Sequence, residues 1–119
     1  VAYSAKQEQA IAALQRRMTT GGVNSPSVKE CKTAVGEDVY QSLLDLGRLK
    51  QVSHDVVYSV KIYEQLTGKI VTYLQKQGQI NAAQARDILG TSRKYAIGLL
   101  EHLDDIKITR RVGDNRELY

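Results

Sequence analysis

An internal repeat constrains the fold of this 119-residue chain more than any other feature of its sequence. Apolar residues spaced four, three and three apart occur twice, and this spacing is typical of a helix face that runs into a strand. The matching residues lie 57 positions apart: Val23-Asn24, Val39, Leu43, Leu46, Leu49 and Lys50, and then Ile80-Asn81, Ala96, Leu100, Leu103, Ile106 and Lys107. We therefore expect two units of one design, residues 1–59 and 60–119, against the alternative of a chance likeness between two amphipathic helices.

The first unit has the pattern of a helix, a short strand, two further helices and a hairpin. A capping box at Ser4–Gln7 precedes an apolar stripe of helical spacing. Ser25 and Pro26 offer an N-cap and a first-turn proline for the second helix, and Gly47 ends the third. The expected helices are residues 5–20, 26–34 and 37–46, and the expected hairpin strands are residues 49–52 and 56–59.

The second unit repeats this order. A second capping box at Asn81–Gln84 starts its middle helix, Gly90 closes that helix, and Thr91 or Ser92 caps the next one. Gly113-Asp114-Asn115 supplies residues that tolerate the positive φ angles of a tight hairpin turn. The expected helices are residues 63–77, 82–89 and 92–105, and the expected hairpin strands are residues 107–112 and 117–119.

Three small helices followed by a hairpin make the winged-helix variant of the helix-turn-helix. The sequence thus predicts a mainly α-helical α+β fold with small β-hairpins, built as two tandem winged-helix domains. In such folds the third helix and the hairpin, or wing, are the elements that usually meet nucleic acid.

Positive charge is concentrated in the second unit. The chain has a net charge of +4, and residues 60–119 hold ten bases and seven acids. Arg93 and Lys94 lie in the first turn of the third helix, where the helix dipole disfavours cations. A phosphate bound at that helix end explains them. The wing adds Lys107, Arg110, Arg111 and Arg116, and the alternative for all six bases is a solvated polar face.

The first unit lacks this charge pattern. Its third helix opens with Glu37 and Asp38, which repel phosphate. Its wing tip holds Ser53-His54-Asp55. We interpret this unit as a spacer or a protein-contacting module, with nucleic-acid binding through Arg16, Arg17, Lys29 and Lys32 as the alternative.

Composition excludes several other functions. His54, Asp55 and His102 do not make a nucleophile, base and orienting group within reach of one another. One cysteine and two histidines give no confident zinc site, and the spacing of Cys31 indicates a core residue. No phosphate-binding nucleotide loop, membrane-spanning segment or secretory signal is visible in the sequence. We expect no catalysis, no metal and no cofactor, a cytoplasmic location, and an origin within a longer protein because residue 1 is Val.

The segments Leu89–Ala96, Leu99–Glu101 and Thr109–Asp114 resemble the C-terminal region of the SelB family, the bacterial selenocysteine-specific elongation factors. The resemblance is most specific over residues 89–118 and extends across the chain as an architecture of two winged helices. It implies binding to an mRNA stem-loop, the SECIS hairpin that marks a UGA codon for selenocysteine, with the ribosome as a further partner. It points to Ser92, Arg93, Lys94, Arg110, Arg111 and Arg116.

We therefore expect a monomeric RNA-hairpin-binding fragment of a translation elongation factor, whose GTPase part would lie upstream. The alternatives are a regulator that binds duplex DNA and a protein-interaction module with incidental charge. The full set of candidate RNA-binding residues is Thr91, Ser92, Arg93, Lys94, Lys107, Arg110, Arg111, Asn115 and Arg116.

Overall fold

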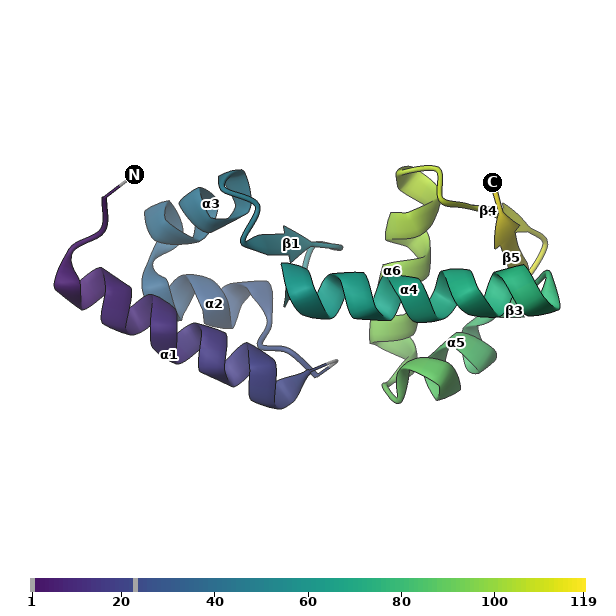
Figure 1. Ribbon diagram of the computed structural model, residues 1–119, viewed down its shortest axis with the longest axis horizontal. Coiled ribbons are helices and arrows are strands. Elements are labelled where there is room, and N and C mark those ends of the chain that lie inside the picture. The colour runs from purple at the N-terminus through teal and green to yellow at the C-terminus, as the bar shows by residue number, and fades with distance from the viewer. Residues whose placement is uncertain (1, 23) are drawn as a thin grey trace. The chain divides into compact units, whose positions relative to one another are not determined.

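The computed structural model describes residues 2–22 and 24–119 (Figure 1). The chain divides into two compact units, Val1–Tyr63 and Glu64–Tyr119. The division falls inside one helix, α4, close to the expected domain boundary at residue 59. Val23, which belongs to the predicted repeat, lies outside the described residues.

The first unit has three helices and a two-stranded antiparallel hairpin in which Leu49 pairs with Ser59. An isolated bridge joins Ser27 to Val56, just before the second helix. The elements are α1 (Ala5–Gly21), α2 (Val28–Val35), α3 (Glu37–Asp45), β1 (Leu49–Gln51) and β2 (Val57–Ser59).

Capping boxes start the first two helices. The Ser4–Gln7 box is confirmed, but the expected start of the second helix at Ser25 and Pro26 is wrong. The N-cap is Ser27, whose hydroxyl accepts from the Glu30 amide at 3.1 Å while the Glu30 carboxylate accepts from the Ser27 amide at 3.2 Å. This reciprocal pair satisfies two backbone donors, more than Ser25 offers with Pro26 behind it.

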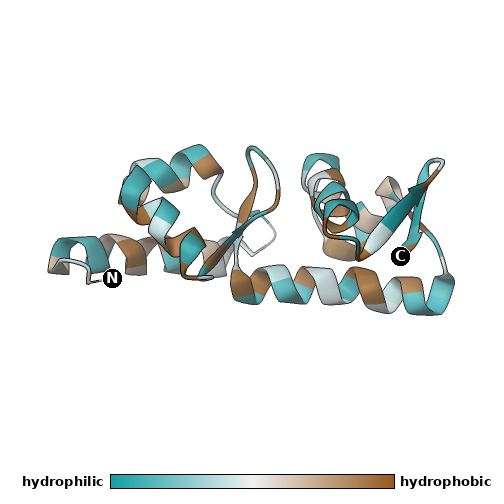
Figure 2. Cartoon of the chain, turned by 90° about the horizontal axis from the view of Figure 1, so that it is seen from above, coloured by the Kyte–Doolittle hydropathy of each residue, from teal (hydrophilic) through white to brown (hydrophobic). Residues whose placement is uncertain are grey.

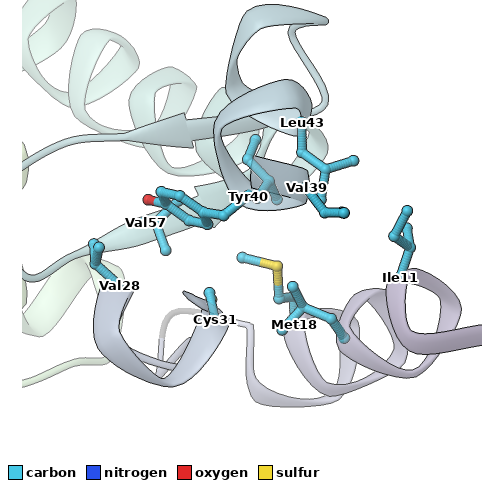
Figure 3. Packing of buried hydrophobic residues seen from close by; sticks show 10 residues of the cluster. Ile11, Met18, Val28, Cys31, Val39, Tyr40, Leu43 and Val57 are labelled. Atoms are coloured by element: carbon cyan, nitrogen blue, oxygen red, sulfur yellow. The ribbon is translucent and has the colours of Figure 1, made fainter. Parts of the chain in front are cut away.

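The core of the first unit packs the apolar stripes of its helices against the hairpin (Figure 3). Cys31 is fully buried there, as its spacing predicts, and Tyr40 supplies a buried aromatic ring. The buried residues of this core are Ile11, Leu14, Met18, Val28, Cys31, Val39, Tyr40, Leu43, Leu49 and Val57.

The second unit repeats the plan with a three-stranded antiparallel sheet in the order β3-β5-β4. Its core is aliphatic and includes Leu66, Ile70, Leu99 and Leu103. Gly68 does not interrupt the first helix of this unit, which runs through it. The elements are α4 (Val60–Gln77), β3 (Ile80–Asn81), α5 (Ala82–Leu89), α6 (Arg93–Asp105), β4 (Thr109–Val112) and β5 (Asn115–Leu118).

The repeat is one of architecture, but its spacing is not constant. Both third helices end in the same hydrogen-bonded motif. Gly47 and Arg48 donate to Leu44 and Leu43 in one unit, and Lys107 and Ile108 donate to Asp104 and Leu103 in the other. The helix ends are thus 60 residues apart.

The predicted pairing at 57 residues is therefore wrong beyond the third helices. Helix α3 has 9 residues and α6 has 13, which lengthens the spacing from one end of the helix to the other. Leu49 corresponds to Thr109, the first residue of the equivalent strand. Ile106, the residue at 57, is instead the exposed C-cap of α6.

Candidate nucleic-acid interface

A groove of about 510 Å³ lies on the second unit between the start of α5, one face of α6 and the β4–β5 hairpin. It brings together Arg93 from the helix with Arg111 and Arg116 from the hairpin. Its lining residues are Asn81, Ala82, Ala83, Arg93, Ile97, Glu101, Arg111, Asp114 and Arg116.

The helical side of the groove is one face of α6, because Arg93, Ile97 and Glu101 are spaced four residues apart. The N-cap Ser92 is extended, and among the described residues its hydroxyl makes no capping hydrogen bond. By contrast, Asn81 caps α5 through a reciprocal box. The first amides of α6 are therefore left with donor capacity for an anion beside Arg93.

The hairpin presents two different faces. Arg111 pairs in register with Arg116, and Arg110 pairs with Glu117. Side chains alternate along a strand, so Arg110 lies on the opposite face of the hairpin from the two arginines that line the groove. The prediction that the wing bases converge on one surface is wrong for Arg110. The hairpin that ends at the C-terminus is mostly hydrophilic (Figure 2).

Arg116 is buried, with 7% of its side chain exposed. Its Nε donates to Oδ2 of Asp104 at 3.1 Å, and the buried Thr109 hydroxyl donates to Oδ1 of the same carboxylate at 2.6 Å. Asp104 was expected only as one of the acids at the far end of α6. It is the partner of a wing base.

Arg110 is held by a different acid. Its Nε donates to Oε1 of Glu117 at 2.8 Å, and Gln79 donates to the other oxygen of that carboxylate at 3.4 Å. The hydrogen bond from Arg110, followed by that from Gln79, lowers the pKa of Glu117 below its ordinary value. Arg110 is therefore partly neutralised within the protein.

The remaining predicted residues surround the start of α6 or the base of the wing. The Nζ atoms of Lys94 and Lys107 each lie 5.7 Å from a ring centroid, of Tyr95 and Tyr119 respectively. Asn115 Nδ2 donates to Gln79 at 3.4 Å. The Thr91 hydroxyl is buried and has no hydrogen-bond partner among the described residues.

Several groove residues were not predicted from the sequence. Asn81, Ala82 and Ala83 come from the start of α5, and Glu101 and Asp114 are acids within a basic surface. The capping box at Asn81 was visible in the sequence, and the two alanines leave space beside α6. What the sequence does not show is that this helix start faces the wing.

The first unit has a groove of about 570 Å³ in the same place, between its second helix, the start of its third and its wing. Glu37 stands there at the first position of α3, as Arg93 does in α6, and Gln51 occupies the strand position of Arg111. Its bases, Lys29 and Lys32, come instead from α2. The equivalent grooves therefore differ in both the sign and the source of their charge.

Within residues 2–22 and 24–119, no group of three or more His, Cys, Asp or Glu side chains could hold a metal ion. No helix of that part of the chain is both long and apolar enough to cross a membrane.

The family model that matches residues 72–118 is that of the elongation factor SelB, winged helix. A selenocysteine-specific elongation factor of Desulfomicrobium baculatum is 30% identical over 80 residues, which are 67% of this chain and 13% of that protein. The chain thus spans a small part of the length of this relative.

Two solved structures are similar over 98% of the chain. The mRNA-binding domain of elongation factor SelB from E. coli, solved in complex with SECIS RNA, has a TM-score of 0.71 and 25% identity and is itself covered to 98%. A bacterial selenocysteine-specific elongation factor has a TM-score of 0.77 and 19% identity over 20% of its length. The predicted α+β fold of winged helices is confirmed by these likenesses.

Proposed function

Because residues 72–118 form a winged helix of the SelB family, we propose that this chain binds an mRNA stem-loop of the SECIS type. The proposal draws on the similar E. coli domain, which was solved with that RNA. In the longer protein, binding would bring a selenocysteine-specific elongation factor to a UGA codon.

The groove of the second unit is the observation that carries this proposal. Arg93 and Arg111 are exposed side chains on two of its walls. Arginine suits phosphate because its guanidinium donates two parallel hydrogen bonds. A phosphate at the start of α6 would meet Arg93 together with the open amides of the first turn.

The groove suits a hairpin loop better than a duplex. A-form RNA hides the base edges of its major groove, whereas unstacked loop bases expose theirs. Glu101 and Asp114 are acceptors in the groove for base amino groups, and Arg111 is a donor. Thr91, Ser92, Lys94, Lys107, Arg110, Asn115 and Arg116 complete the proposed binding region around this pair of arginines.

We propose that the first unit acts as a spacer or contacts a protein, with the ribosome as a further partner. Glu37 and Gln51 replace the two groove arginines there, and this supports a different role. We further propose that the chain works in the cytoplasm as a monomer and binds RNA without catalysis or a cofactor. Any GTPase activity would belong to another part of the longer protein.

The test is a gel-shift panel of SECIS-type RNA hairpins, hairpins with altered loops, and duplex DNA of equal charge. We expect the matched hairpin to bind most tightly. Its affinity should fall with salt by roughly 0.7–0.9 log units per log unit of salt for each phosphate neutralised. Equal affinity for every nucleic acid of equal charge would contradict loop recognition.

The panel also separates the two alternatives. A duplex-DNA regulator would prefer DNA and would dimerise to match paired half-sites, which light scattering would detect. A protein-interaction module would bind none of the nucleic acids strongly.

A further inference from the structure

One ion pair joins the end of α6 to the wing. Asp104 lies in the last turn of the helix, and its two oxygens accept from Thr109 in β4 and Arg116 in β5. A single carboxylate thus holds both strands of the hairpin. Resting on the proposed function, we infer that Asp104 and Arg116 are positioning residues, which set the wing so that Arg111 lines the groove.

Burial supports a positioning role. Arg116 is 6% exposed and Thr109 is fully buried, so both groups face the interior of the second unit. A buried guanidinium is costly unless it is paired, and losing one partner leaves an uncompensated charge. Asp104 therefore constrains Arg116, and with it the strand β5, to one place.

Register connects this pair to the groove. Arg111 is the cross-strand partner of Arg116. Two like charges directly opposite each other destabilise a hairpin, and Asp104 compensates one of them. With Arg116 turned to the carboxylate, Arg111 is the exposed member of the pair and is available to RNA.

Charge and position make opposite predictions for Asp104. The change Asp104→Asn removes a negative charge from an RNA-binding unit, and electrostatics alone predicts tighter binding. If the carboxylate positions the wing, the same change weakens binding. The neighbouring exposed acid Asp105 is the matched control, because Asp105→Asn alters the charge equally without touching the pair.

The experiment measures the affinity of the full chain and its variants for the hairpin over a range of salt. We expect Asp104→Asn to weaken binding on the order of tenfold, and Asp105→Asn to leave it unchanged or slightly tighter. Arg116→Gln should weaken binding without changing the salt slope. The double variant should lose no more than the larger single loss, because both changes break one interaction.

Two results would overturn the inference. One is that Asp104→Asn binds as tightly as Asp105→Asn. The other is that Arg116→Gln lowers the salt slope by roughly 0.7–0.9, as expected for a lost phosphate contact. If Asp104→Asn unfolds the second unit, Thr109→Val takes its place. It removes one hydrogen bond with no change in charge, and it should weaken binding at an unchanged salt slope.

Hydrogen exchange of the free chain separates this inference from the proposed function. We expect the amides of β4 and β5 to exchange faster in Asp104→Asn than in Asp105→Asn. If the unaltered chain binds no RNA hairpin, the proposed function fails, and the exchange result alone decides whether the ion pair holds the wing. Equal exchange in both variants overturns the inference.

Discussion

Arginines that look alike in the sequence differ in what surrounds them. Arg93 and Arg111 are exposed in the groove. Replacing either with Ala should weaken hairpin binding by roughly 1–3 kcal/mol, because each change removes charge-assisted contacts to RNA. Filter binding at fixed salt measures this loss.

Arg110 provides a control one residue away. It lies on the other face of the same strand and is paired with Glu117, so Arg110→Ala should cost less than Arg111→Ala. Arg16→Ala and Lys32→Ala in the first unit should have little effect. Similar losses from all of these changes would contradict the assignment of binding to the groove.

Lys107 has a backbone conformation that glycine adopts more easily. Its φ is +62°, and the equivalent residue of the first unit is Gly47 at +73°. Left-handed backbone costs an L-residue roughly 1–2 kcal/mol. Lys107→Gly should therefore raise the free energy of unfolding by up to about 1 kcal/mol after the added entropy of the unfolded chain is offset.

Urea denaturation of the full chain tests this expectation. Gly47→Ala is the reciprocal control and should lower the free energy of unfolding by about 1 kcal/mol. A loss of stability in Lys107→Gly would show that contacts of the lysine side chain, such as that with Tyr119, outweigh the backbone strain.

At the scale of helices and strands, local signals were sufficient for most of the fold. Both capping boxes singled out in the sequence form, because they depend on residues three apart. The start of α2 was misplaced by giving weight to Pro26 over Ser27. The end of α6 was obscured since Lys107, not glycine, takes the left-handed position. A constant repeat spacing failed for the same local reason, the longer α6.

The groove was harder to predict because it depends on tertiary pairing. The sequence indicated that Arg93 and Arg111 lie on the right elements. It did not indicate that Asp104 would bind Arg116 or that the start of α5 would form a wall. Hairpin register decides which wing arginine faces inward, and a change of one residue in register would exchange Arg110 with Arg111.

Helix α2 and its partners make the first unit sensitive to high pH. Burial raises the pKa of the Cys31 thiol to about 11 and that of Tyr40 to about 12. The unfolded chain releases these protons near their ordinary values of 9.0 and 10.0. The folded state then binds more protons than the unfolded state, so stability falls as pH rises above about 9.

Each group contributes up to about 1.4 kcal/mol of lost stability per pH unit between its unfolded and folded pKa. Urea denaturation at several pH values from neutral upward measures the decline. In Cys31→Ala the part that begins near pH 9 should be absent, while the part due to Tyr40 begins near pH 10. Identical pH profiles for both chains would contradict the role of the thiol.

At the scale of the whole molecule, the net charge of +4 is a poor guide to where RNA binds. Two double variants make this testable. Arg93→Ala with Arg111→Ala, and Lys29→Ala with Lys32→Ala, each lower the net charge to +2, the first in the groove of the second unit and the second in that of the first. Long-range attraction to RNA falls equally in both.

A difference between these variants must therefore come from local contacts. We expect the change in the second unit to reduce the salt slope of hairpin binding by about 1.5, as two lost phosphate contacts require, and to abolish most of the affinity. The change in the first unit should keep the slope of the unaltered chain and lose only the weak effect of net charge. Equal reductions would mean that Lys29 and Lys32 also contact RNA. The two units would then share the hairpin, although Glu37 faces RNA where the second unit has Arg93.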